Sequence, residues 1–169
     1  EELERLLEAT KQSAKRDLHT AVVLSLSTGA RKMEIWGLRW RDVDLKAGQA
    51  TLRETKNGLT RTIPIKAYAL ELMRQRSKVR RIDTDLVFPS TVNPQKSFDF
   101  RKAWEAVLRR VKIEDFRWRD LRHCAGSYLA MSGASVREIA EILGHKTLQM
   151  AMRYSHLTEK HSASVVRVD

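Results

Sequence analysis

The sequence predicts an α+β fold that is mainly helical and carries a small three-stranded antiparallel sheet. Apolar residues recur at helical spacing along most of the chain, whereas residues 42–65 break into short runs of strand-forming residues separated by turns. With 169 residues, of which 42% are hydrophobic, the chain suits one folded domain with its own core. No repeat or linker divides the sequence, so we expect residues 1–169 to form one domain.

The amino-terminal part predicts three helices. Leucines recur at helical spacing in "EELERLLEATKQSA", and an apolar segment from about residue 17 to 27 precedes Gly29, a residue type that commonly ends helices. A short helix is expected next, in "RKMEIWGLRW".

A change of period predicts the sheet. Turn residues at Gly48 and at the pair Asn57 and Gly58 separate three runs that are typical of strands, near 42–45, 50–55 and 60–65. The second hairpin places Lys56 at its tip. We therefore expect a three-stranded antiparallel sheet whose second hairpin presents a lysine.

Helical spacing resumes from Lys66. The helix expected there closes with five basic residues and no acid among positions 74–81, which suits either a solvated helix end or a contact with phosphate. A loop that contains two prolines, "LVFPSTVNPQKS", comes next. Gly133 and Gly144 separate the later helices, which are expected near 98–111, 118–132, 135–143 and 147–154.

The charge balance favours a polyanionic partner. Lys and Arg total 32 against 21 Asp and Glu, which gives a formal net charge of +11 and a pI of about 10.2. Such an excess is typical of nucleic-acid-binding proteins, although charge alone does not separate DNA from RNA or from anionic lipid.

Several kinds of site are excluded by residue content. The single cysteine, Cys124, rules out an intrachain disulfide and a cysteine zinc cluster, and it favours a reducing, intracellular setting. No histidine pair has metal-ligand spacing and no acidic cluster suits magnesium, so we expect no metal site. No apolar run approaches the roughly 18 residues of a membrane span, so we expect no membrane partner.

Some candidate residues also allow simple structural interpretations. Arg31 and Glu34 lie one helical turn apart, where a surface ion pair alone would explain them.

Tyr154 is not so simply explained, because it stands at a helix end among polar residues, which is an unusual place for a core tyrosine. The segment "SVREIAEILGHKT" has the pattern of a helix-turn-helix, which leaves a DNA-binding regulator open.

The helix expected from about residue 118 combines an apolar stripe with a polar face. The stripe predicts buried side chains at Trp118, Leu121, Ala125, Tyr128 and Leu129. The adjacent face holds Arg119, Arg122, His123 and Gly126. A glycine on this face lets another backbone or a ligand come close.

Taken together, four segments resemble the catalytic domain of the tyrosine recombinase, or phage integrase, family. They are "TGARKMEIWGLRW", the hairpin lysine, "DLRHCAGSYLAMSG" and "EILGHKTLQMAMRYSHL", in that order and at that spacing. The resemblance covers about residues 1–164. It implies the catalytic domain of a site-specific recombinase or integrase, without the amino-terminal core-binding domain that family members usually carry.

The resemblance assigns chemical roles. Tyr154 would attack a DNA phosphodiester to give a 3′-phosphotyrosyl link and a free 5′-hydroxyl, and a second strand's 5′-hydroxyl would reverse the step. Arg31 and Arg122 would bind the non-bridging oxygens, because a guanidinium is always charged and reaches two oxygens. His145 would donate to one of these oxygens, and Lys56 would protonate the leaving 5′-oxygen. Bond energy is conserved, so no cofactor and no metal are implied.

Further residues and partners follow from the same resemblance. Glu34 matches the acid that positions Arg31. Contacts with DNA are expected from Arg53, Arg61, Arg117 and Lys146. The expected partner is double-stranded DNA, bound by a homotetramer on paired sites in the full-length protein. The expected setting is cytoplasmic and nucleoid-associated, in a protein encoded by a bacterium or a phage.

One position departs from the family pattern. Members usually show His-x-x-Arg at this helix start, with the histidine as a candidate acceptor of the tyrosine proton, whereas residues 119–122 here read Arg-Asp-Leu-Arg. Arginine does not act as a base near neutral pH. Either Arg119 holds a phosphate oxygen and leaves proton removal to water, His145 or the phosphate, or the chain is a recombinase-like DNA-binding module with impaired cleavage.

Overall fold

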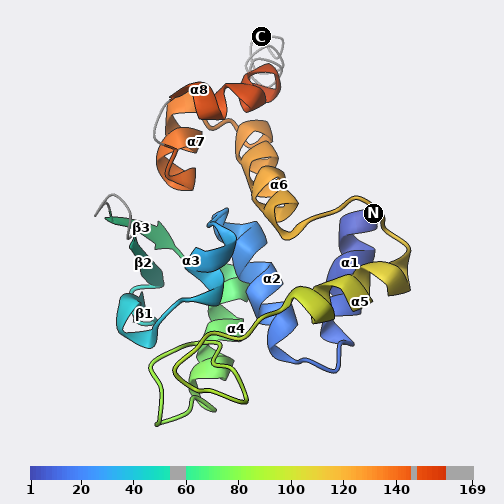
Figure 1. Ribbon diagram of the computed structural model, residues 1–169. Coiled ribbons are helices and arrows are strands. Elements are labelled where there is room, and N and C mark those ends of the chain that lie inside the picture. The colour runs from blue at the N-terminus through green and yellow to red at the C-terminus, as the bar shows by residue number, and fades with distance from the viewer. Residues whose placement is uncertain (54–59, 146–147, 159–169) are drawn as a thin grey trace.

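A computed structural model describes residues 1–53, 60–145 and 148–158 (Figure 1). Within these ranges the fold is α+β and mainly helical, which confirms the predicted class. The elements, in chain order, are α1 (Glu2–Lys11), α2 (Asp17–Thr28), α3 (Lys32–Trp36), η1 (Trp40–Asp42), β1 (Val43–Asp44), β2 (Gln49–Arg53), β3 (Thr60–Pro64), α4 (Ala67–Ser77), α5 (Arg101–Val111), α6 (Trp118–Met131), α7 (Val136–Leu143), α8 (Leu148–Ala151) and η2 (Met152–Tyr154).

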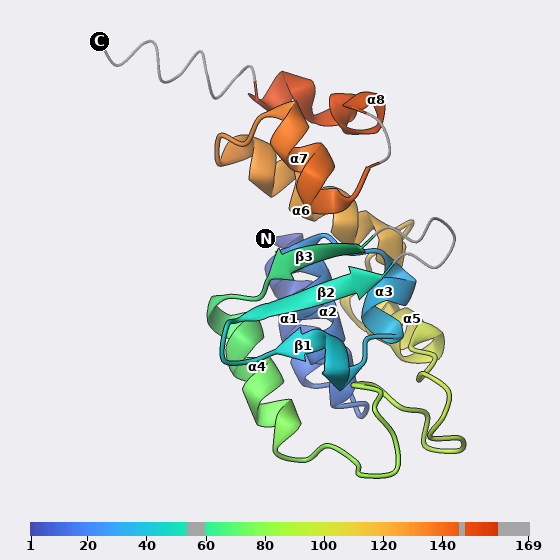
Figure 2. The ribbon, with the colours of Figure 1, turned by 90° about the vertical axis from the view of Figure 1, so that its left-hand side faces the viewer.

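The three strands form an antiparallel sheet in the order β1-β2-β3, and β3 lies nearest to α7 (Figure 2). Ala50 pairs with Ile63 and Leu52 pairs with Arg61. Directly paired residues share one face of a sheet, and three of these four are buried apolar residues. The register therefore places Arg61 on the inner face of the sheet, at the strand that approaches α7.

Trp118 fixes the start of α6 in the main core. Its ring contacts Trp36 edge-on, with the ring centroids 5.3 Å apart, and its indole N–H donates to the hydroxyl of Ser25 on α2 across 3.1 Å. Buried aromatic rings contribute much of a core's stability, and a buried indole N–H needs a partner of this kind. Because Arg122 follows one helical turn after Trp118, this packing also sets the position of Arg122.

A second apolar cluster joins α6 to the carboxy-terminal elements. Figure 1 shows α6 running from α2 toward α7 and α8. The cluster consists of Ala130, Ile139, Ala140, Leu143, Ala151 and Tyr154. A capping box starts α7, since the Ser135 hydroxyl accepts from the Glu138 backbone N–H and the Glu138 carboxylate accepts from that of Ser135. The cap therefore fixes where α7 begins, and the cluster packs α7, including Leu143 of its last turn, with α6 and the carboxy-terminal elements.

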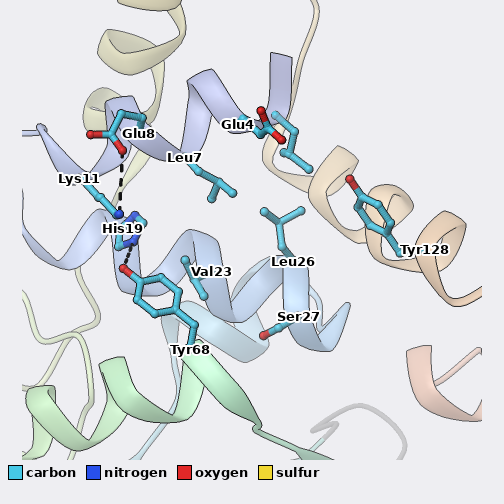
Figure 3. A pocket seen from close by; sticks show the side chains of 11 residues that line it. Glu4, Leu7, Glu8, Lys11, His19, Val23, Leu26, Ser27, Tyr68 and Tyr128 are labelled. Carbon is cyan, nitrogen blue, oxygen red and sulfur yellow. Dashed lines mark hydrogen bonds and ion pairs between the residues drawn. The ribbon is translucent and has the colours of Figure 1, made fainter. Parts of the chain in front are cut away.

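A groove of about 470 Å³ lies between α1, α2, α4 and α6 (Figure 3). At its base His19 makes hydrogen bonds of 2.8 Å with the hydroxyls of Thr10 and Tyr68. Tyr128 is 52% exposed on the wall of this groove, so its predicted place in the core is wrong. The helical spacing is right, but the ring of Tyr128 lies on the open wall of the groove.

Several helix boundaries differ from the prediction, and α5, expected from about residue 98, begins at Arg101. The helix expected to continue through the basic positions 78–81 ends at Ser77. The helix expected over 147–154 consists instead of the single turn α8 and a 3₁₀ turn that ends at Tyr154. None of the helices in the described residues is both long and apolar enough to cross a membrane.

The junction of α2 with α7 generates the first prediction. Gly29 ends α2 with φ at +69°, and a Cβ there would lie 2.2 Å from Leu143 Cδ2 and 3.3 Å from Ala125 Cβ. We expect Gly29→Ala to lower the free energy of unfolding by about 2 kcal/mol or more, because a left-handed backbone disfavours a side chain and the methyl group displaces Leu143. Urea unfolding at pH 7 measures this change.

Ser27→Ala, two residues earlier in α2, is the matched control. Ser27 is exposed, so the control should unfold within about 0.5 kcal/mol of the unmodified protein. Equal stability of the two variants would contradict the close contact between α2 and α7.

Candidate active site

Three arginines from distant parts of the chain converge on the end of α7. The last carbonyls of a helix lack partners within the helix and carry its partial negative charge. Here they accept from guanidinium groups: Arg61 Nε donates to Ile142 O (3.3 Å), Arg122 Nη2 to Leu143 O, and Arg31 Nη2 to Gly144 O (3.0 Å). Arg122 Nη1 also donates to the carbonyl of Gly29, across 2.6 Å. Successive carbonyls of α7 therefore gather three positive charges.

Glu34 links two of these arginines. Its carboxylate accepts two hydrogen bonds from the Arg61 guanidinium, of 2.7 and 2.9 Å, and one of 2.7 Å from the backbone N–H of Arg31. The Arg31 guanidinium lies farther away, with Nη1 3.9 Å from Glu34 Oε1. The sequence predicts that Glu34 positions Arg31. Glu34 contacts Arg31 at its backbone N–H and, across 3.9 Å, at its guanidinium, and the bidentate partner of Glu34 is Arg61.

The charges of this cluster are set by burial and by one another. Burial alone would raise the pKa of the Glu34 carboxyl, but hydrogen bonds from Arg61 and the Arg31 backbone hold it below its ordinary value. Burial, together with repulsion from Arg31 and Arg61, lowers the pKa of Arg122 to about 10. Both groups therefore stay ionised at neutral pH. Three guanidinium groups face one carboxylate, so the cluster keeps an excess of positive charge that suits an anion.

His145 follows Gly144 at the edge of the same cluster. Burial and the charges of Arg122 and Arg31 lower its pKa to about 4, so the ring is neutral at physiological pH. His145 Nδ1 and Arg31 Nη1 are both buried and have no hydrogen-bond partner among the described residues. Buried polar atoms are rarely left unpaired, because an unpaired group costs about 1–3 kcal/mol. These two atoms suit a polar ligand at the cluster.

Tyr154 lies beside α6 at the end of η2. Its side chain is 4% exposed, and its ring passes so close to Gly126 that a Cβ there would lie 2.4 Å from Tyr154 Cζ. The Tyr154 hydroxyl is 3.1 Å from Nδ1 of His123, the residue directly after Arg122. Burial raises the pKa of Tyr154, although the positive charges of Arg153 and Arg122 oppose this shift. The hydroxyl therefore keeps its proton at neutral pH.

His123 is the site residue whose role the sequence does not indicate. In the sequence it stands as a polar-face residue of α6 without metal-ligand spacing. The available signal is its position, because His123 lies three residues before the glycine that admits the Tyr154 ring. His123 and Tyr154 are 31 residues apart in the sequence, so no local pattern predicts their contact.

The other predicted residues lie in varied surroundings. Arg119 and Arg117 are exposed at the start of α6, and the Arg119 side chain forms no hydrogen bond with the described residues. Arg53 is exposed and donates to Asp42 across 2.9 Å. Lys56 and Lys146 lie outside the described residues. The predicted DNA contacts of Arg53, Arg61 and Arg117 stay predictions, and Arg61 has its guanidinium engaged with Glu34.

The geometry disfavours a helix-turn-helix regulator. That hypothesis requires a second helix long enough to enter a DNA groove, and α8 has 4 residues. A regulator without chemistry also gives no reason for Arg31 and Arg122 to meet at the end of α7, with Arg122 directly before His123, which contacts Tyr154. The segment is better explained as the support of the arginine cluster.

Comparisons with known proteins agree with this arrangement. The model of the phage integrase family matches residues 1–161. The chain is similar to the shufflon-specific DNA recombinase of Escherichia coli, with 37% identity over 83% of this chain and 35% of that protein. It spans about half the length of the curated relatives that it matches.

Solved structures show the same fold. The catalytic domain of bacteriophage HP1 integrase superimposes with a TM-score of 0.74 and 28% identity, covering 98% of this chain and 90% of that one. The crystal structure of XerA recombinase gives a TM-score of 0.80 with 23% identity, over 97% of this chain and 60% of that one.

The Glu34 ion pair generates a prediction about pH. A carboxylate whose folded pKa is lowered adds stability above its unfolded pKa, and this contribution is lost as the pH falls toward the folded value. We expect Glu34→Gln to lower the free energy of unfolding by about 2 kcal/mol at pH 7. The difference from the unmodified protein should shrink below about pH 4.3, the ordinary carboxyl pKa.

Urea unfolding at several pH values from 7 to 3 measures this difference. Glu8→Gln, at an exposed carboxylate of α1, is the matched control and should show no such difference at any pH. A Glu34→Gln difference that stays constant down to pH 3 would contradict the proposed charge state.

Proposed function

Because this chain belongs to the phage integrase family, we propose that it is the catalytic part of a tyrosine-type site-specific recombinase that cuts and rejoins double-stranded DNA. The observation that carries the proposal is the convergence of Arg31, Arg61 and Arg122 on the end of α7, beside the helix that contacts Tyr154. A site with excess positive charge and unpaired donors suits a phosphodiester, and a tyrosine hydroxyl suits its transfer.

The chemistry follows from the charges on these residues. The phosphodiester binds with its non-bridging oxygens toward Arg31 Nη1, the Arg122 guanidinium and a neutral His145. As Tyr154 attacks phosphorus, negative charge grows on these oxygens, and fixed cations in a buried site stabilise that charge more than water does. The product is a 3′-phosphotyrosyl link and a free 5′-hydroxyl. A 5′-hydroxyl of a second strand reverses the step and joins the new strand.

The remaining roles complete the proposal. Lys56, which lies outside the described residues, protonates the leaving 5′-oxygen. Exposed Arg53 and Arg117, together with Lys146, contact the DNA backbone, and such contacts make binding sensitive to salt. In the full-length protein a homotetramer on paired DNA sites exchanges the strands.

Covalent capture from a randomised pool tests this proposal and finds the target sequence in the same experiment. Each duplex carries a nick just 3′ of the candidate phosphate. After cleavage the short strand with the new 5′-hydroxyl diffuses away, and its loss prevents the reverse step, so the covalent intermediate accumulates. We expect denaturing gels to show a covalent protein–DNA band, because attack by Tyr154 makes a bond that detergent does not break. Sequencing the captured strands identifies the target.

Tyr154→Phe is the control, since it removes one oxygen from a ring that packs against Gly126. Its band should be absent while its affinity for the captured duplex, measured by fluorescence anisotropy, is kept. An equal band from Tyr154→Phe, or no band from the unmodified protein with any duplex, would contradict the proposed function.

A further inference from the structure

The proposed reaction lacks an acceptor for the tyrosine proton. The Tyr154 hydroxyl is neutral at physiological pH because burial raises its pKa, so the proton must leave during the attack. Arg119 stands at the position where family members usually carry a histidine, and a guanidinium does not accept protons. The Arg119 side chain is also exposed and forms no hydrogen bond with the described residues. Another group must therefore take the proton.

We propose that His123 Nδ1 accepts the proton of the Tyr154 hydroxyl during the attack, which makes His123 a catalytic residue. The inference rests on the proposed strand transfer. His123 Nδ1 lies 3.1 Å from Tyr154 Oη, within the distance that direct proton transfer requires. Nothing in the family pattern around Arg119 assigns this role to the residue after Arg122.

Arg153 indicates which nitrogen of His123 carries the lone pair. Its Nη1 lies 2.8 Å from Nδ1 and 3.1 Å from Nε2 of the ring. A guanidinium only donates hydrogen bonds, so it favours a lone pair on the ring nitrogen that it approaches most closely, which is Nδ1. Nδ1 has one lone pair, and in the proposed step the Tyr154 proton takes it in place of the Arg153 contact.

The charges around His123 keep the ring ready to accept a proton. Burial lowers its pKa, and Arg153, Arg119 and Arg122 lower it further, while Asp120 opposes them. The ring is therefore neutral at pH 7. A bound phosphate adds negative charge next to these arginines, which raises the basicity of His123 once the substrate is in place.

His145 is a weaker candidate for the same step. In the ligand-free protein its pKa is lowered to about 4, and a bound phosphate raises the basicity of both histidines, so the contacts of the two rings distinguish them. The unpaired Nδ1 of His145 suits a ligand oxygen better than the Tyr154 hydroxyl, which already has His123 as its partner.

The step balances in atoms and charge. The bond from Tyr154 Oη to phosphorus forms, the bond from phosphorus to the 5′-oxygen breaks, and the Tyr154 proton moves to His123 Nδ1. The leaving 5′-oxygen takes a proton from Lys56 in the proposed mechanism. The charged imidazolium then faces Arg153, and this repulsion favours return of the proton to Tyr154 when the strands rejoin.

His123→Asn separates proton transfer from simple positioning. The asparagine amide oxygen occupies nearly the place of Nδ1 and accepts a hydrogen bond from Tyr154, but it does not hold a proton. With a captured duplex, we expect the rate of covalent-complex formation at pH 7 to fall by about 10²–10⁴-fold, the usual contribution of a general base. Affinity for the duplex should be unchanged.

The pH profile gives a signature that a structural role would not produce. In the unmodified protein the rate should rise tenfold per pH unit at acidic pH and level off once His123 is neutral. In His123→Asn this inflection should vanish, and the rate should keep rising into the alkaline range as Tyr154 itself ionises.

The outcomes are distinguishable. A His123→Asn protein with the rate and pH profile of the unmodified protein would overturn the role of His123. Absence of any covalent complex from the unmodified protein would instead contradict the proposed function. Nitrogen-15 NMR of the unmodified protein with labelled histidines does not depend on whether His123→Asn folds. A proton on His123 Nδ1 at pH 7 would also overturn the proposal.

Discussion

The hydrogen bonds between three guanidinium groups and the last carbonyls of α7 are the interaction on which the site depends. Burying several like charges is unfavourable unless each finds acceptors. The helix end supplies three unpaired carbonyls and the negative end of its dipole, and Glu34 supplies the one carboxylate of the cluster. The arginines are thus held in place before any ligand arrives, which is what electrostatic stabilisation of a developing charge requires.

Burial and nearby arginines set the protonation of the two histidines. Burial lowers the pKa of both rings; Arg122 and Arg31 of the cluster lower that of His145 further, and Arg153 adds more than Arg122 to the shift of His123, so both rings are neutral at physiological pH. A neutral ring can donate from one nitrogen and accept at the other, which a charged ring cannot do. The two histidines are thereby suited to different tasks: the unpaired Nδ1 of His145 suits a phosphate oxygen, and His123 contacts the Tyr154 hydroxyl.

Periodicity was sufficient to predict most of the fold. Glycines and changes of spacing located the helices and the sheet to within a few residues, because these signals depend on local backbone chemistry. The exposure of Tyr128 was missed, since helical spacing does not reveal how much of a ring the neighbouring elements cover.

The site was only partly predictable, for a related reason. Arg31, Arg122, His145 and Tyr154 stand in recognisable segments, but the inward direction of Arg61 depends on strand register, and the His123 contact depends on how η2 packs against Gly126. Both are contacts between distant parts of the chain, which a local pattern does not encode.

The most direct measurement of the central claim is a crystal structure of the Tyr154→Phe protein bound to a nicked duplex recovered by covalent capture. The account predicts one DNA phosphate whose non-bridging oxygens accept hydrogen bonds from Arg31, Arg122 and His145, while the arginines keep their bonds to the α7 carbonyls. A phosphate bound elsewhere, or arginines that leave α7 to reach the DNA, would contradict it.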